Sequence, residues 1–272
     1  MKSKVVLVSG CSRGLGKMLA ESLAKKDYVV YAGIRDLEGT KELTSSWKKL
    51  LPNIKPVKLD VTSDADCEKA VGEIYKKEKR LDVLINIVGY SKAGPLEQFS
   101  VEDYKNILDT NAIGAFRLIR QVVPLMKKQK KGKIINVTSL NGLLALPNFG
   151  IYCSSKFALE ALGLSLRYEL VRDNVWVTNV EPGAIYSKDG NAVKLPHTPV
   201  REKFWFLRRF LPMIEREEVV KAIEKLIANP SPPAQIILGP DALATTFLQK
   251  YLPGFIWDKL LIYVWARQNE KK

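Results

Sequence analysis

The sequence is poor in the residues that form metal sites and cross-links. It contains one histidine, His197, and three cysteines, Cys11, Cys67 and Cys153, which lie far apart without CxxC spacing. This scarcity excludes a small disulfide scaffold and argues against a histidine-based triad or a His/Cys metal site, so we expect no metal ligands. An odd number of separated thiols is typical of a reducing compartment, which predicts a cytoplasmic protein.

Long apolar runs are also scarce. The run at residues 5–8 is too short for a secretory leader. The most apolar region, residues 243–266, is broken by Lys250, Pro253, Asp258 and Lys259. Because a spanning helix needs about 18 uninterrupted apolar residues, we expect neither a leader nor a transmembrane anchor.

Acidic residues are outnumbered by basic ones. The 272 residues include 43 Lys and Arg against 29 Asp and Glu, a formal net charge of +14, and 46% of them are hydrophobic. This is the composition of a globular chain, and its positive excess suits nucleic acid, an acidic membrane surface or a phosphate-rich cofactor. The basic run at residues 127–133 has no interleaved aromatic side chains for stacking bases, so we expect no nucleic-acid partner.

What the chain does contain is an alternation of β-branched runs and helical segments. This alternation predicts an α/β fold with a doubly wound, seven-stranded parallel (Rossmann) sheet. We expect one catalytic domain at residues 1–240, which includes a lid insert at 184–215, and an apolar C-terminal extension at 241–272. The predicted strands are residues 5–8, 28–34, 54–60, 81–86, 133–139, 175–181 and 234–238, and the predicted helices lie near 15–26, 64–79, 101–128, 152–172 and 216–228.

A glycine-rich loop follows the first predicted strand and leads into a helix. It contains Gly10, Gly14 and Gly16. Glycine lets the backbone approach a pyrophosphate closely, and the free N–H groups at a helix N-terminus attract that anion. The position of this loop between a strand and a helix therefore predicts dinucleotide binding.

The end of the second predicted strand indicates which dinucleotide binds. Arg35 follows this strand, and Arg13 in the glycine loop is a second cation. An arginine here is typical of recognition of a 2′-phosphate, whereas an acid would bind a 2′-hydroxyl. Asp36 is the opposing signal, although it lies one residue further on and fits the start of the next helix. We predict NADP(H) rather than NAD(H).

Tyr152 and Lys156 lie four residues apart in a predicted helix, so they share a face. A neighbouring ammonium favours the phenolate and would lower the tyrosine pKa from its usual value of about 10. Such a pair can exchange a proton with an alcohol or a ketone.

Together, these residues resemble the short-chain dehydrogenase/reductase family. The loop from Ser9 to Gly16 is similar to its TGxxxGxG motif, Ser139 precedes Tyr152 by the family's spacing of 13 residues, and Pro182-Gly183 follows the sixth strand. The resemblance spans about residues 4–187. Ile87 and Val88 depart from the family's NNAG motif, and we interpret them as repacking that supports the sheet.

The resemblance implies a role for each matching residue. Tyr152 would be the general acid/base, Ser139 would hydrogen-bond the substrate oxygen, Lys156 would hold the nicotinamide ribose, and Asn111 would anchor a proton-relaying water. A homodimer or homotetramer that pairs the helices at 101–128 and 152–172 is also implied. The implied cofactor contacts are Gly10, Ser12, Arg13, Gly14, Leu15, Gly16, Arg35, Asp60, Val61, Asn86, Gly89, Tyr152, Lys156, Pro182, Gly183 and Ile185.

The segments around Tyr152 are apolar and are most similar to the hydroxysteroid and retinol dehydrogenase branch. They predict a lipophilic alcohol, ketone or aldehyde of steroid, retinoid or fatty type, bound by Ser139, Leu146, Tyr152 and Phe204. Two alternatives stay open: a 3-oxoacyl thioester reductase that meets an acidic carrier protein, and a non-catalytic NADP(H)-sensing or scaffold protein.

Residues 201–210 and 255–265 mix aromatic rings with positive charge. Such segments can lie in a membrane interface, which would make the cytoplasmic protein peripheral at a membrane surface. The alternative is a lid and a tail that pack over the pocket or across a subunit contact.

Overall fold

The computed structural model describes residues 3–186 and 213–269. Its core is one parallel sheet, and the order β3-β2-β1-β4-β5-β6-β9 confirms the predicted seven-stranded Rossmann fold. The order changes direction at β1 and β4, where α/β folds bind ligands beyond the carboxyl ends of the strands. The strands are β1 (Val5–Val8), β2 (Val29–Ile34), β3 (Ile54–Lys58), β4 (Val83–Asn86), β5 (Gly132–Val137), β6 (Val175–Pro182) and β9 (Gln235–Leu238).

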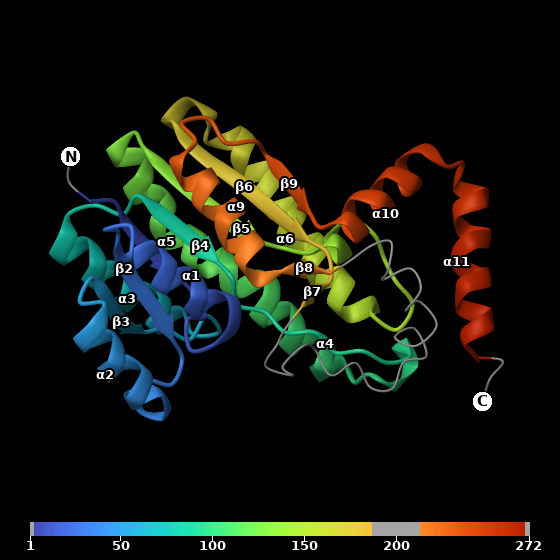
Figure 1. The fold of residues 1–272 in the computed structure, drawn as a ribbon, viewed down its shortest axis with the longest axis horizontal. Helices are drawn as coiled ribbons and strands as arrows, with labels where there is room; N and C mark the ends of the chain where they lie inside the picture. The colour runs from blue at the N-terminus through green and yellow to red at the C-terminus, as the bar shows by residue number, and fades with distance from the viewer. Residues whose placement is uncertain (1–2, 187–212, 270–272) are drawn as a thin grey trace.

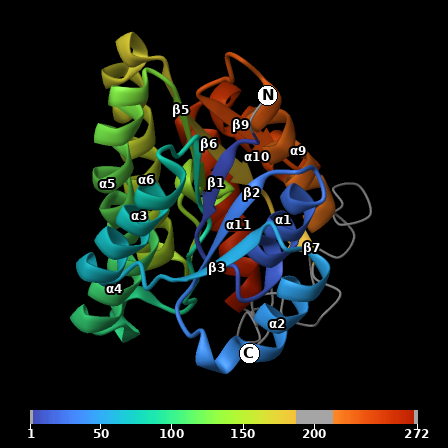
Figure 2. The ribbon, with the colours of Figure 1, turned by 90° about the vertical axis from the view of Figure 1, so that its left-hand side faces the viewer.

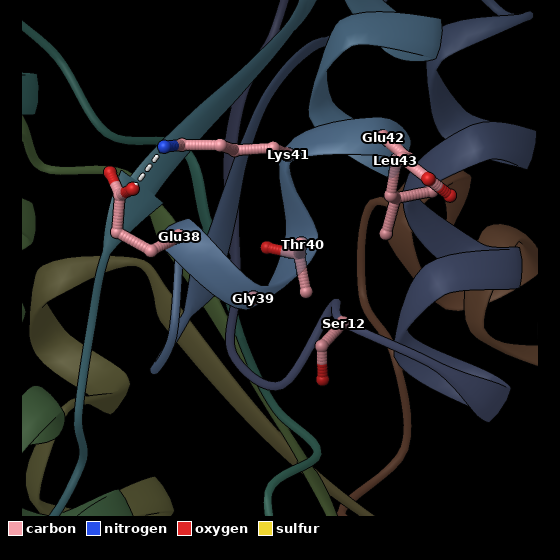
Figure 3. A pocket seen from close by; sticks show the side chains of 7 residues that line it. All are labelled: Ser12, Glu38, Gly39, Thr40, Lys41, Glu42 and Leu43. Carbon is pink, nitrogen blue, oxygen red and sulfur yellow. Dashed lines mark ion pairs between the residues drawn. The ribbon is translucent and has the colours of Figure 1, made fainter.

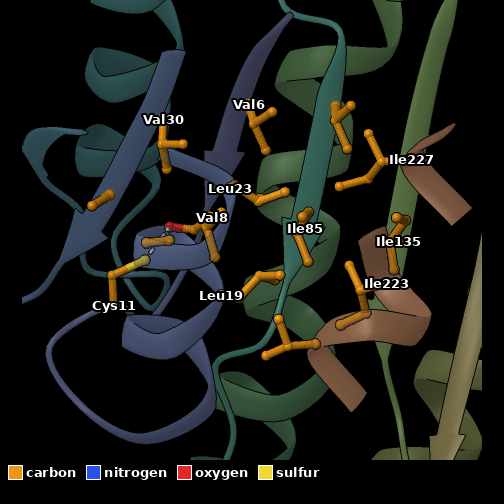
Figure 4. Packing of buried hydrophobic residues seen from close by; sticks show 14 of the residues in the cluster. Val6, Val8, Cys11, Leu19, Leu23, Val30, Ile85, Ile135, Ile223 and Ile227 are labelled. Atoms are coloured by element: carbon orange, nitrogen blue, oxygen red, sulfur yellow. Dashed lines mark hydrogen bonds between the residues drawn. The ribbon is translucent and has the colours of Figure 1, made fainter. Parts of the chain in front are cut away.

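Helices cover both faces of the sheet because its central strands, such as β1 and β4, are buried on both sides. In β1, Val6 and Val8 pack in one cluster, and Val5 and Leu7 pack in another. Helices α1 (Gly14–Ala24), α2 (Lys41–Leu50) and α9 (Arg216–Ala228) contribute to the first cluster, and α3 (Asp64–Glu78) and α5 (Gly114–Gln129) contribute to the second (Figure 2). Figure 4 shows residues of the first cluster, among them Val8, Leu19, Leu23, Ile85, Ile135, Ile223 and Ile227.

Before β6, the structure differs from the predicted helices in two places. Helix α2 lies in a stretch rich in Lys, Ser and Thr, and it is fixed by Trp47, which is buried and donates a hydrogen bond to Glu21 at 2.8 Å. The helix predicted at 101–128 is divided into α4 (Val101–Leu108), a π-helical turn at Asp109–Ile113 and α5. Helix α6 (Gly150–Glu169) is close to its predicted bounds. Short 3-10 turns lie at Glu38–Thr40, Leu96–Gln98, Leu140–Gly142 and Val171–Asp173.

The C-terminal part contains two helices that were not predicted. Helix α10 (Pro240–Tyr251) leads to α11 (Gly254–Asn269), which stands away from the sheet in Figure 1. None of the described helices has the length and apolar character needed to cross a bilayer. Of the predicted lid, β7 (Ile185–Tyr186) and β8 (Ile214–Glu215) form a small parallel pair, and residues 187–212, with Phe204 among them, lie outside the described residues.

The start of α10 packs against residues that follow β5 in a small third cluster. Ala242 is fully buried in a cluster with Leu140 and Leu144, and Asp241 accepts a hydrogen bond from the Ala184 N–H at 2.7 Å. The division of the chain at residue 240 therefore stays a prediction.

Candidate active site

The glycine loop connects β1 to α1, and its backbone conformation and close packing disfavour residues with a side chain at its glycine positions. Gly10 and Gly14 have φ values of 74° and 60°, in the left-handed region that favours glycine. A Cβ on Gly16 would lie 2.3 Å from the Gly10 carbonyl oxygen. Arg13 caps α1 in extended conformation without a side-chain cap, and the first turn carries no acid. The helix N-terminus is thus ready for an anion from outside the chain.

Beyond β2, two cations lie at the predicted 2′-phosphate position. Arg35 is exposed, and the Lys58 Nζ donates to its carbonyl oxygen at 2.6 Å, because Lys58 pairs with Ile34 in the sheet. Asp36 instead accepts the Gly39 N–H at 2.9 Å, so its carboxylate stabilises the following turn. The sequence analysis missed Lys58, whose only signal was its place at the end of an edge strand.

Asp60 and Val61 follow β3, and Asp60 lies near these cations. Burial opposes ionisation of Asp60, but hydrogen bonds from Thr62 and the charges of Arg35 and Lys58 hold its pKa below the usual value. Val61 is buried against Gly114, where a Cβ would lie 2.7 Å from a Val61 methyl carbon. Both residues therefore shape the wall of the site through loop geometry and packing.

A hollow of about 490 Å³ opens next to the glycine loop (Figure 3). It is lined by Ser12 and by the segment from Glu38 to Leu43. Glu38 and Lys41 form an ion pair on this segment. Arg35 and Asp36 come just before the segment that lines this hollow. The hollow therefore suits the nucleoside end of a dinucleotide.

Tyr152, Ser139 and Lys156 meet where β5 ends and α6 begins. The Tyr152 hydroxyl lies within hydrogen-bonding reach of the Ser139 side chain, which opposes the rise in the Tyr152 pKa. The Lys156 Nζ lies 6.0 Å from the centroid of the Tyr152 ring and donates to the Val137 carbonyl oxygen at 3.1 Å. Lys156 is only 4% exposed. The structure thus brings together the three side chains that sequence spacing had grouped.

Asn111 lies on the π-helical turn and is fully buried. Its Oδ1 accepts the Tyr90 N–H at 3.0 Å, and its Nδ2 donates to the Tyr90 carbonyl at 2.8 Å and to the Ser155 Oγ at 3.0 Å. Gly89 closes this corner, because a Cβ there would lie 3.2 Å from Asn111 Oδ1 and 3.3 Å from Lys156 Nζ. Tyr90 and Ser155, which sequence reasoning missed, therefore hold Asn111 in place.

Comparison with known proteins decides the family. The model of the family described as short chain dehydrogenase matches residues 4–194. The chain belongs to the short-chain dehydrogenase/reductase family. It is similar to human retinol dehydrogenase 8, with 34% identity over 251 residues, which are 85% of this chain and 79% of that one. The predicted family, including its retinol dehydrogenase-like branch, is confirmed, and the chain is an oxidoreductase.

Two further similarities extend the comparison. The chain is 31% identical to a 3-ketodihydrosphingosine reductase of Bacteroides thetaiotaomicron, and the match covers 88% of this chain and 89% of that protein. A solved structure of ElxO with NADP bound has a TM-score of 0.75 and 26% identity, and the match covers 88% of this chain and 96% of that one.

The other predicted cofactor residues of this short-chain dehydrogenase lie along the same edge of the sheet. Leu15 and Gly16 are in the first turn of α1, and Pro182 ends β6. Gly183 lies against Asp241, and Ile185 is in β7. Asn86 ends β4 with its side chain buried in the sheet, where it donates to Asn136 at 2.9 Å. Leu146, predicted to bind substrate, packs against the cluster of Leu140, Leu144 and Ala242.

The protonation states at the site differ from the sequence-based expectation. Burial raises the pKa of Tyr152, and the hydrogen bond with Ser139 opposes this only in part. Burial also lowers the pKa of Lys156 to about 8, against the charge of Glu160. The expected lowering of the tyrosine pKa is not seen, because Lys156 donates to Val137 and both groups lie in a poorly solvated site.

Proposed function

We propose that the chain is an NADP(H)-dependent oxidoreductase that transfers hydride between nicotinamide and a lipophilic alcohol, ketone or aldehyde. The observation that carries the proposal is the meeting of Tyr152, Ser139 and Lys156 beside Asn111 and the side-chain-free corner at Gly89. A dinucleotide fits this edge because the loop carries no side chains at Gly10, Gly14 and Gly16, and the space where a Cβ of Gly14 would lie is open. When bound, the nicotinamide supplies the hydride, and the protein supplies orientation and protons.

Each polar residue of the site then has a defined task. Ser139 donates a hydrogen bond to the substrate oxygen, and Tyr152, kept as a phenol by its raised pKa, donates the proton during carbonyl reduction. Lys156, as an ammonium ion, holds the nicotinamide ribose. The Asn111 side chain is occupied by Tyr90 and Ser155, so the relaying water would contact its main chain on the π-helical turn.

The preference for NADP(H) rests on Arg35, Lys58 and Arg13. Arg35 and Arg13 are exposed cations, while the acid that would bind a 2′-hydroxyl, Asp36, is engaged with Gly39. The NADP in the ElxO structure supports the same choice. Replacing Arg35→Ala should raise the KM for NADPH far more than the KM for NADH, and Arg80→Ala, a cation at the other end of the sheet paired with Asp82, is the control. An equal rise for both cofactors would contradict this assignment.

The substrate is proposed to be lipophilic because the cluster of Leu140, Leu144 and Leu146 lies next to Ser139. The names of the relatives, a retinol dehydrogenase and a ketodihydrosphingosine reductase, support lipid alcohols or carbonyls. The apolar residues exposed on α10 and α11, such as Phe247 and Phe255, support contact with a membrane surface. Phe116 and Phe157, exposed on α5 and α6, support the proposed homo-oligomer.

The function is tested by NADPH oxidation with a panel of carbonyl compounds. The loss of NADPH absorbance is recorded with and without anionic liposomes. We expect turnover with retinoid, steroid or long-chain carbonyls. Turnover only with 3-oxoacyl thioesters would replace the proposed substrate class. No turnover with any carbonyl, despite NADPH binding, would contradict catalysis and favour a sensing or scaffold role.

A further inference from the structure

A ladder of three buried asparagines crosses the sheet below the active site. Asn86 of β4 pairs with Asn136 of β5, which pairs with Asn179 of β6 in the strand register. The Asn86 Nδ2 donates to Asn136 Oδ1 at 2.9 Å, and the Asn136 Nδ2 donates to Asn179 Oδ1 at 3.0 Å. Each amide donates to the next group, and Asn136 and Asn179 also accept from the amide before them, so the ladder has a fixed direction.

The ladder ends on a buried carboxyl group of α6. The Asn179 Nδ2 donates to Glu160 Oε2 at 2.6 Å, and the Gln235 Nε2 of β9 donates to the same oxygen at 3.3 Å. Glu160 is 4% exposed. Oε2 of this buried acid is therefore firmly held as an acceptor.

A second buried acid lies against the first. Glu181 of β6 is fully buried, and its carboxyl lies within hydrogen-bonding reach of the Glu160 carboxyl. Neither Glu181 oxygen nor Glu160 Oε1 makes a hydrogen bond of good geometry within the described part of the chain. The Gln235 side chain and the Glu181 N–H lie close enough to the Glu181 carboxyl to offset part of the rise in its pKa. Burial raises the pKa of both groups, and the charge of Glu160 raises that of Glu181 further. One proton would turn this repulsion into a hydrogen bond.

The acid pair is next to the proposed ribose-binding lysine. Glu160 follows Lys156 by one helical turn, and Gly142 packs against both, since a Cβ there would lie 2.9 Å from Glu160 Cγ and 3.1 Å from the Lys156 carbonyl oxygen. Burial works against the ammonium form of Lys156, and Glu160 favours it. The groups that act on the two carboxyls from the packed strands are Thr138, Asn179 and Gln235.

We propose that Glu160 and Glu181 hold one proton between them, and that the single negative charge which remains keeps the buried Lys156 in its ammonium form. The two acids are positioning residues, since they act through Lys156. The inference rests on the role given to Lys156 in the proposed function.

The test is the alkaline limb of kcat/KM for NADPH-dependent reduction in four proteins. In the wild type the limb should fall near pH 8, where Lys156 discharges. In Glu181→Gln the introduced amide donates to Glu160, one carboxylate remains, and the limb should stay in place. The double variant Glu160→Gln/Glu181→Gln removes the charge, and the alkaline limb of its kcat/KM should shift to lower pH by about one unit or more. Glu169→Gln, an exposed acid on α6, is the control and should not move the limb.

A double variant whose activity falls without movement of the limb would show a structural role alone and would overturn the proposal.

A second measurement does not depend on turnover. Carbon-13 NMR of protein labelled at the Glu carboxyl and Lys ε carbons should show one carboxyl still protonated at neutral pH in the wild type. That signal should be absent in Glu181→Gln, and the Lys signal assigned through Lys156→Met should titrate near pH 8. Absence of a protonated carboxyl in the wild type would overturn the proposal even if the enzyme is active. Its presence in a protein without turnover would instead point to failure of the proposed function.

Discussion

At the scale of single residues, Gly16 and Gly72 differ in the room that each leaves for a side chain. Gly16 has no room for a side chain, because a Cβ would lie 2.3 Å from the Gly10 carbonyl oxygen and the backbone would have to shift. Gly72 provides the contrast. It is exposed within α3, and a Cβ there would meet no atom within 4 Å. The same substitution should thus have opposite effects at the two positions.

We expect Gly16→Ala to destabilise the fold by about 2 kcal/mol, the cost of overpacking, and to abolish measurable NADPH binding. Gly72→Ala should stabilise it by about 0.5–1 kcal/mol, because glycine is a poor helix former. Urea unfolding and NADPH fluorescence titration measure the two effects. Normal NADPH affinity in Gly16→Ala would show that the loop does not hold the pyrophosphate.

At the scale of strands and helices, the asparagine ladder ties β4, β5 and β6 together. Asn136 is its middle member and is fully buried. Asn136→Leu should cost about 3 kcal/mol of unfolding free energy, because it leaves an Asn86 donor and an Asn179 acceptor buried without partners. Ile135→Val on the same strand should cost about 1 kcal/mol. Urea unfolding would contradict the ladder's role if the two variants were equally stable.

The strands were predictable because buried parallel strands are apolar on both faces, as in β1 and β4. The π-helical turn at Asp109–Ile113 was not, since apolar periodicity continues through it. Tyr152 and Lys156 were grouped by helical spacing, whereas the contact of Glu160 with Glu181 joins a helix to a strand and leaves no local pattern. Helix α2 was missed because Trp47 alone marks its buried face.

At the scale of the whole molecule, the C-terminal helices place apolar side chains in contact with solvent. Phe247 is 61% exposed, Phe255 is 66% exposed, and the Phe247 ring lies 4.6 Å from that of Tyr251. The pair α10–α11 projects from the side of the molecule where β9 forms the sheet edge (Figure 1). Exposed rings in this arrangement suit a membrane interface.

We expect Phe247→Ser/Phe255→Ser to reduce co-sedimentation with anionic liposomes while leaving reduction of a water-soluble carbonyl intact. Leu50→Ser on α2, equally exposed at 69%, is the control and should not change sedimentation. If the double variant binds liposomes normally but changes from dimer to monomer in light scattering, the surface is a subunit contact and the membrane assignment is wrong.

We propose that Tyr152 donates the proton, and single-turnover NADPH oxidation by Tyr152→Phe tests this role most directly. Removing the hydroxyl leaves the ring and Lys156 in place, so the rate should fall by at least about 100-fold while the Kd for NADPH stays near the wild-type value. Tyr168→Phe, on the exposed face of the same helix, should behave as the wild type. A Tyr152→Phe enzyme that oxidises NADPH at the wild-type rate would contradict the account.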